Sequence, residues 1–241
     1  MDRAAYSSMS AQEADHWWFV ARRAIISHLI ERHVPLADDA RILEAGCGTG
    51  GNLSLLAGHG TLDAFEYDAD ARALAAGHGI GTIAGGALPH DIGFGDTEYD
   101  MIALLDVLEH IDDDRASLAA LGGRLKTDGR LLLTVPAVPW LWSDHDALHH
   151  HKRRYTRDGL QAVAQDAGMQ VQAIGYFNSL LFPLAVAQRM AHQLTRSKAA
   201  LDARPSAPVN AMLRGIFAAE RHLVDHIRFP IGLSLYAVLS R

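Results

Sequence analysis

Residues 42–51 read Ile-Leu-Glu-Ala-Gly-Cys-Gly-Thr-Gly-Gly, and this stretch decides the fold. A short apolar run leads into a glycine-rich turn, and residues 53–57 then have the pattern of a helix. Glycines in such a turn let the backbone approach a ligand closely, and the helix that follows presents its free N-terminal amides. The stretch therefore predicts a strand, a ligand-binding loop and a helix of an α/β domain.

The chain outside this stretch continues the same alternation. Further strands are predicted at 62–67, 81–84, 100–105, 130–135, 169–177 and 232–239, with helices at 68–77, 112–125 and 157–167. Continuous apolar strands that alternate with helices are typical of a mostly parallel sheet. The predicted fold class is α/β, with a seven-stranded, Rossmann-like sheet and helices on both of its faces.

Composition limits the classes of function. The chain has 241 residues and a formal net charge of −6, which argues against nucleic acid as the main partner because such binding depends on neutralised phosphates. The single cysteine, Cys47, excludes an internal disulfide and fits a reducing compartment. No apolar run of about 20 residues and no basic-then-apolar N-terminal pattern is present. We therefore expect no transmembrane segment and a cytoplasmic location.

Two acidic residues distinguish between the ligands that such a loop binds. Gly46, Gly48 and Gly51 also fit a dinucleotide pattern, and Glu66 follows about 20 residues on, so an NAD-dependent oxidoreductase is one alternative. Glu44, however, ends the first strand beside the loop. Its carboxylate would repel a pyrophosphate and attract a ligand that carries an ammonium and a sulfonium. The two oxygens of Glu66 can accept from both ribose hydroxyls.

Residues 41 to about 135 resemble the class I methyltransferases that use S-adenosylmethionine (SAM). The glycine loop is similar to their first motif, residues 65–67 to their second-strand acid, and residues 99–110 to their fourth strand and its exit. The resemblance implies that SAM is the cofactor and S-adenosylhomocysteine the product. One departure is the run Gly-Gly-Ala at 85–87, where many relatives carry an aspartate that binds the adenine.

The resemblance also implies a set of cofactor-binding residues. The methionine part would lie at the loop, the ribose at the second-strand acid, and the adenine after the third strand. The predicted residues are Arg22, Glu44, Gly46, Cys47, Gly48, Thr49, Gly50, Glu66, Tyr67, Ala87, Leu88, Asp106, Val107 and His110. Trp17 and Arg22 belong to an amphipathic helix predicted at 10–33, which either packs on the sheet or forms a lid over the sulfonium and the acceptor.

Residues 1–241 are expected to form a single methyltransferase domain. Its predicted parts are an N-terminal helical lid (1–38), a SAM-binding core (39–177), a helical insertion (178–229) and the final strand (230–241). The apolar stretch 176–187 would form an acceptor pocket, a dimer contact or an interfacial helix, and 199–208 a polar loop. The expected assembly is a monomer or a homodimer. If the stretch is an interfacial helix, the protein would also contact a membrane surface peripherally.

Candidate acceptor chemistry is concentrated in residues 140–155, after the fifth strand. This segment resembles a bacterial methyltransferase subgroup (type 11/12-like) with the pattern Asp-x4-His-x-Arg-Arg-Tyr. Here the pattern falls on Asp146, His151, Arg153, Arg154 and Tyr155. The arginines would grip an anionic part of the acceptor, because guanidinium groups pair with phosphate or carboxylate at two points. The alternative is that Arg-Arg-Tyr only pins the loop to the sheet.

Proton removal from a hydroxyl acceptor needs a base, and histidine is the natural one near neutral pH. His145 or His151 is the predicted base, oriented by Asp144 or Asp146. Asp106, Glu109 and His110 with a later histidine also allow a metal site, but we expect His110 to line the SAM pocket and no metal to be bound.

These observations predict an enzyme that transfers the methyl group of SAM to an acceptor. Oxygen is preferred to nitrogen, because the acceptor segment is rich in potential bases. The acceptor would be a small molecule or a glycan- or lipid-linked one. The alternative from another class is a SAM-binding regulator or partner subunit without catalysis.

Overall fold

The computed structural model describes residues 10–195 and 205–241, and only the backbone of residue 145 and of residues 191–195. Seven strands form one sheet in the order β3-β2-β1-β4-β5-β7-β6. The strands are β1 (Arg41–Ala45), β2 (Thr61–Glu66), β3 (Thr82–Gly85), β4 (Tyr99–Leu105), β5 (Leu125–Pro136), β6 (Gln170–Phe177) and β7 (Ser234–Ser240). Only β7 runs antiparallel to its neighbours β5 and β6, which confirms the mostly parallel α/β sheet.

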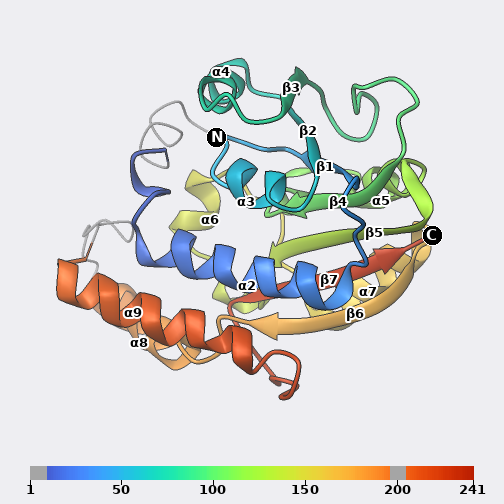
Figure 1. The fold of residues 1–241 in the computed structure, drawn as a ribbon. Coiled ribbons are helices and arrows are strands. Elements are labelled where there is room, and N and C mark those ends of the chain that lie inside the picture. Colours follow the sequence, from blue (N-terminus) through green and yellow to red (C-terminus); the bar gives the residue numbers. More distant parts are fainter. Residues whose placement is uncertain (1–9, 196–204) are drawn as a thin grey trace.

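Helices cover both faces of the sheet, as predicted (Figure 1). One face packs against α2 (Trp17–His33), α3 (Leu53–Ala57), α4 (Ala69–Gly77) and α9 (Ala207–Ala219). The other packs against α5 (Asp114–Gly122) and α7 (Arg157–Asp166). Asp68, Asp113 and Thr156 cap α4, α5 and α7 by accepting from backbone amides of the first turn, which fixes where these helices begin.

The N-terminal helix differs from its prediction. α2 begins at Trp17 rather than near residue 10, because His16 is its N-cap and accepts from the amide of Trp18. Ile25 and Leu29 of α2 are fully buried, so this helix is a layer of the domain packed on the sheet. Packing on the sheet is one of the two arrangements expected for this helix, and the lid stays a prediction.

β5 is longer than predicted, because it begins at Leu125 and not at Arg130. Tyr99 pairs with Leu125, and a bulge follows before Met101 pairs with Arg130. The intervening residues 126–128 are polar and half-buried or exposed, and residue 129 is a glycine, so this part does not show the apolar pattern by which a buried strand is recognised.

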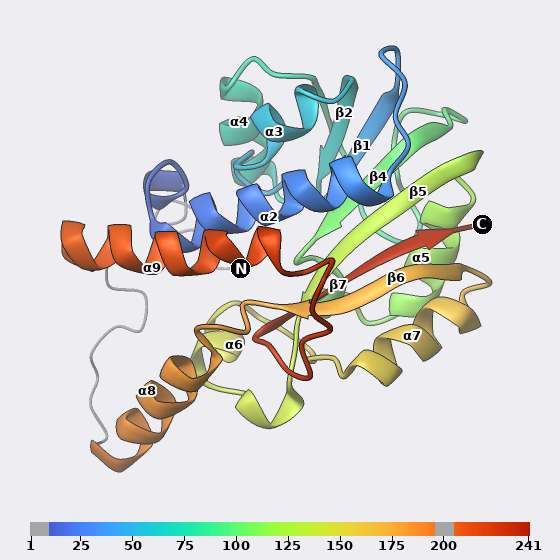
Figure 2. The same cartoon turned by 60° about the horizontal axis from the view of Figure 1, so that its bottom comes forward.

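The predicted insertion divides into two helices with different environments. α9 lies along α2, whereas α8 (Phe182–Thr195) points away from the sheet (Figure 2). Phe217 of α9 is fully buried against Trp17 and Phe177, which makes α9 part of the domain. The loop predicted at 199–208 lies mostly outside the described residues. No helix in the described ranges is long and apolar enough to cross a bilayer.

Candidate functional site

The carboxyl ends of β1, β2, β3, β4 and β5 meet at one edge of the sheet, because these strands are parallel. Ligands of open α/β sheets bind at this edge. The glycine loop follows β1 there. Gly46 has a φ of +73°, and a Cβ atom at this position would lie 2.8 Å from a methyl of Val107. The predicted residues Gly46 and Val107 are therefore in contact, and only glycine fits at this crossing.

Glu66, at the end of β2, is tied to the glycine loop. One of its oxygens accepts from the amide of Gly48 at 2.8 Å, and the other from the amide of Asp68 at 2.9 Å. Tyr67 follows with an exposed side chain, and Cys47 is buried beneath the loop. Burial, with Glu44 and Glu66 nearby, raises the pKa of the Cys47 thiol, so this residue packs rather than reacts.

Glu44 is buried with half of its carboxylate unpartnered. Its Oε1 accepts from Nδ2 of Asn52 at 2.9 Å, whereas Oε2 has no hydrogen-bond partner. Burial raises the pKa of Glu44 to about 8, against the opposing hydrogen bond from Asn52. A buried carboxylate with an open oxygen is a suitable partner for the ammonium of an amino-acid ligand. Sequence reasoning missed Asn52, which nothing but its position before α3 could have indicated.

Arg22 connects α2 with the exit of β4. Its Nη2 lies 2.5 Å from Oδ2 of Asp106 and donates to Oγ1 of Thr134 at 3.0 Å. The guanidinium also lies over the ring of Trp18, 5.3 Å from its centre. The two predicted residues Arg22 and Asp106 thus meet near Glu44, linked through Asn52.

Trp17 contacts helix α9. Its ring packs edge-on against Phe217 of α9 at 5.9 Å, and its amide donates to Asn210. Trp17 therefore belongs to the contact between α2 and α9, and Trp18 is the aromatic residue that lies beside Arg22. The sequence predicts a shielding role for both aromatics, and this role stays a prediction.

Glu13 covers the glycine loop, a contact that no sequence pattern predicted. Its Oε1 accepts from Oγ1 of Thr49 at 2.6 Å, and its carboxylate fills the position that a Cβ of Gly51 would take. Arg23 holds this turn by donating to the carbonyls of Glu13 and Gly51. On the adenine side, Ala87 forms a two-way backbone bridge with Asp91, and Leu88 packs against the core.

The acceptor segment is organised around Asp146 in α6 (Asp144–Leu148), whose carboxylate is fully buried. It lies 2.9 Å from Nδ1 of His151 and accepts two bonds from Arg154, at 2.7 and 3.0 Å. Ser143 adds a backbone amide at 2.8 Å. Burial alone would raise the pKa of Asp146, but the bonds from His151 and Arg154 hold it far below its usual range. Asp146 is therefore an ionised anchor for His151.

The two arginines and the tyrosine of this segment bind other residues of the same chain. Arg154 is nearly buried, and besides Asp146 it contacts the carbonyl of Ala137. Arg153 and Tyr155 both donate to Asp114 at the start of α5, at 2.7 and 2.9 Å. These contacts correspond to the loop-pinning alternative, and the prediction that the arginines grip an acceptor anion stays untested. The side chain of His145, the other predicted base, lies outside the described atoms.

His151 faces a second group of predicted residues. η1 (Leu108–His110) follows β4, and the ring centre of His110 lies 4.8 Å from that of His151. Oε1 of Glu109 is 4.0 Å from Nε2 of His151. Burial and Asp106 raise the pKa of Glu109 well above its usual value, and burial together with His151 lowers the pKa of His110 to about 4. His110 is thus a neutral imidazole at physiological pH.

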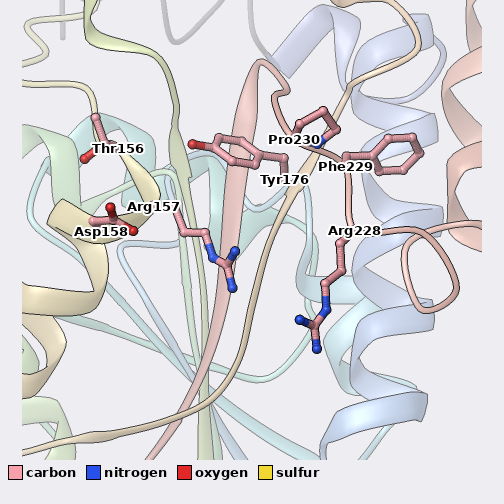
Figure 3. A pocket seen from close by; sticks show the side chains of 7 residues that line it. All are labelled: Thr156, Arg157, Asp158, Tyr176, Arg228, Phe229 and Pro230. Atoms are coloured by element: carbon pink, nitrogen blue, oxygen red, sulfur yellow. The ribbon is translucent and has the colours of Figure 1, made fainter.

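A separate surface pocket of about 280 Å³ lies where α7 begins (Figure 3). Its walls come from α7, β6 and the segment before β7, with the side chains of Thr156, Arg157, Asp158, Tyr176, Arg228, Phe229 and Pro230. β4, β5 and β7 separate its strand β6 from the glycine loop on β1. None of the predicted site residues lines this pocket.

The strand order, with β7 antiparallel, and the glycine loop at the carboxyl edge together define a Rossmann-like nucleoside-binding domain. The model of the methyltransferase domain family matches residues 17–174, so the chain belongs to this family and is a class I SAM-dependent methyltransferase by fold. SAM is its cofactor. This result replaces the NAD-dependent oxidoreductase that the glycine spacing also allowed. No curated protein matches the chain.

Solved structures similar to this one have low sequence identity, so they show the fold alone. A TehB-like SAM-dependent methyltransferase from Corynebacterium glutamicum is 18% identical with a TM-score of 0.55, over 89% of this chain and 86% of that one. The methyltransferase partner of the Trm112 activator from Haloferax volcanii is 15% identical (TM-score 0.63; 99% and 94%). Phosphoethanolamine N-methyltransferase 2 from Haemonchus contortus, in complex with SAM, is 15% identical (TM-score 0.59; 88% and 51%).

Proposed function

We propose that this protein transfers the methyl group of SAM to an oxygen of its acceptor and that His151 is where the acceptor hydroxyl loses its proton. The observation that carries the proposal is the Asp146–His151 pair. Asp146 is ionised and can only accept, so Nδ1 of His151 carries the proton and Nε2 is the basic nitrogen. Nε2 lies on the side of Glu109 and His110, at the exit of β4.

The cofactor would lie along the residues predicted for it. Its ammonium would approach the open oxygen of Glu44, and its carboxylate would approach Arg22. The carboxylate of Glu66 would give up a hydrogen bond from a backbone amide and accept hydrogen bonds from the ribose hydroxyls instead. In the reaction the new O–C bond forms as the C–S bond of the sulfonium breaks, and the electron pair stays on the sulfur of S-adenosylhomocysteine. The protein contributes alignment, which is worth about 7–11 kcal/mol for well-oriented reactants.

The acceptor we propose is lipid-linked or otherwise partly apolar. Trp140 follows β5 at the carboxyl edge, and its ring is 65% exposed while it packs edge-on against Phe182 of α8. Trp142 and Leu184 nearby are also exposed. Aromatic side chains that are packed on one face and exposed to solvent on the other favour amphipathic partners. We place the protein in the cytoplasm. Sedimentation with vesicles would detect peripheral membrane contact, and light scattering would detect a homodimer; a negative result in both would leave an apolar acceptor as the role of these side chains.

The test is binding first and turnover second. Calorimetry should show SAM and S-adenosylhomocysteine binding in the micromolar range, and labelled SAM should then methylate hydroxyl-bearing amphiphiles in a screen. His151→Ala should abolish turnover and keep SAM affinity, whereas His149→Ala should keep both. Cofactor binding with no transfer to any acceptor, oxygen or nitrogen, would support the non-catalytic regulator instead. Unchanged turnover in His151→Ala would remove this residue from the mechanism.

A further inference from the structure

The strongest unexplained feature is the carboxylate of Glu109. Its side chain is 1% exposed, and neither of its oxygens has a hydrogen-bond partner among the described residues. An unpartnered carboxylate in the interior costs several kcal/mol if it is ionised. Most buried polar groups in native proteins are paired, so a group left open in this way points to a ligand that pairs with it.

Two imidazoles face this carboxylate. One ligand atom from each of Glu109, His110 and His151 can be chosen so that all three lie within 4.8 Å of one another. They come from two segments far apart in the sequence, the exit of β4 and the loop after α6, which the sheet edge brings together. Bonds from one cation to nitrogen and oxygen are about 2.0–2.2 Å long, so small side-chain movements would bring all three donors around a single cation.

Asp146 supplies the support that a metal-binding histidine usually has. It holds Nδ1 of His151 at 2.9 Å, and this bond directs Nε2 to the side of Glu109. A carboxylate that fixes the tautomer and the orientation of an imidazole is a common partner of metal-ligating histidines. Arg154 in turn fixes Asp146 through both of its oxygens.

We propose that Glu109, His110 and His151 bind one divalent transition-metal cation. Two imidazoles with one carboxylate suit Zn²⁺, Mn²⁺, Fe²⁺ or Co²⁺ better than Mg²⁺ or Ca²⁺, which prefer oxygen donors. Asp106, which the sequence suggested as a fourth donor, is bound to Arg22. Three protein donors leave coordination positions open, as in catalytic sites. This proposal differs from the expectation drawn from the sequence, which allowed a metal site here but preferred no metal to be bound.

Metal binding would change the role of His151, and this part rests on the proposed function. With the cation bound, Nε2 of His151 is a ligand and not the base, and an acceptor hydroxyl on the cation would have a lowered pKa and lose its proton to solvent. Without the cation, Nε2 of His151 is the base. Metal binding itself needs no acceptor and can be measured without turnover.

The experiment uses the full chain without a histidine tag, stripped with a chelator and titrated with Co²⁺, Zn²⁺, Mn²⁺ and Mg²⁺. Calorimetry should show one Co²⁺ or Zn²⁺ per chain, and bound Co²⁺ should give visible absorption bands. Glu109→Gln and His151→Gln should each weaken Co²⁺ binding by at least about tenfold. His90→Ala, an exposed histidine far along the chain, should leave it unchanged. SAM affinity reports that each variant is folded.

Two outcomes overturn the proposal: no Co²⁺ or Zn²⁺ binding by the stripped wild-type protein, or binding that Glu109→Gln and His151→Gln leave unchanged. Full methyl transfer in a strong chelator would also overturn it, while leaving the proposed function standing. Conversely, Co²⁺ bound at this cluster with no transfer to any oxygen acceptor would refute the O-methylation and support the metal site.

Discussion

Asp146 and His151 are joined by a 2.9 Å contact between a fully buried carboxylate oxygen and Nδ1 of the imidazole. The contact links α6 to the loop that follows it, and Arg154 closes the same carboxylate from the other side. Because the Asp146 carboxylate is already bound at both oxygens, its role is to position His151.

Replacing Asp146 by asparagine should reduce both stability and turnover. The buried partner Arg154 would lose its counter-charge, which costs about 3–5 kcal/mol when one member of a buried pair is removed. The tautomer of His151 would no longer be fixed, so kcat should fall about 10²-fold or more while KM for SAM stays unchanged. A shift in the pH profile of kcat distinguishes positioning from instability. If kcat per folded molecule stays at the wild-type value, the positioning role is wrong.

Glu44 should make cofactor binding depend on pH. Its pKa in the free protein is raised to about 8 by burial, so the carboxyl is mostly protonated at pH 7. A cationic ligand favours the ionised form, and SAM affinity should therefore rise by up to about tenfold per pH unit until pH 8 and then level off. Calorimetry in buffers of different ionisation enthalpy should detect the released proton. Glu44→Gln should bind more weakly and lose the excess pH dependence.

The same raised pKa has a consequence for folding without cofactor. A carboxyl whose folded pKa lies above its unfolded value contributes stability that is complete below about pH 4.5 and is lost as the pH rises through about 8. Glu44→Gln keeps the neutral form at every pH. The difference in melting temperature between Glu44→Gln and the wild type should therefore grow as the pH rises from about 4.5 to about 8 and level off above pH 8, by about 2–4 °C per kcal/mol. Parallel melting curves across pH 6–10 would contradict this.

Arg22→Ala should weaken SAM binding and destabilise the fold together. The change removes the ion pair with Asp106 and the bond to Thr134, at a cost of about 1.5–3 kcal/mol. Arg32→Ala, on the same helix but with an exposed side chain, is the matched control and should change stability by less than about 0.5 kcal/mol. Denaturation and SAM titration of both variants provide the check. Equal losses of stability and SAM affinity in the two variants would show that the contacts of Arg22 contribute to neither.

Alanine substitutions at Gly46 and Gly79 distinguish the cost of backbone strain from the cost of a steric clash. Both have positive φ, but a Cβ at Gly46 meets Val107 at 2.8 Å, whereas one at Gly79 meets nothing within 4 Å. Gly46→Ala should therefore reduce SAM affinity sharply, and Gly79→Ala should cost only about 1–2 kcal/mol of stability. Adding Val107→Ala to Gly46→Ala should recover part of the affinity. No recovery would place the defect in the loop conformation alone.

The sequence by itself determined the fold class and the cofactor edge. Local sequence patterns were sufficient for both. The apolar run at 42–45, the glycines that follow it and the position of Glu66 can each be recognised from adjacent residues in the chain. Contacts between distant segments followed no such pattern. The polar residues 126–128 hid the start of β5, and nothing near Glu13 indicated that it covers Thr49, 36 residues away.

Only the tertiary structure decided what the acceptor segment does. The pattern around Asp146 named the residues but left Asp144 and Asp146 as equal partners for the base, and folding buries only the second. Arg153 and Arg154 look like anion binders in sequence, and the fold pairs them with Asp114 and Asp146. Likewise, Glu109 and His151 are 42 positions apart, and they come together because the parallel strands β4 and β5 end at one edge. Local periodicity sets elements, whereas burial and charge pairing across elements set the site.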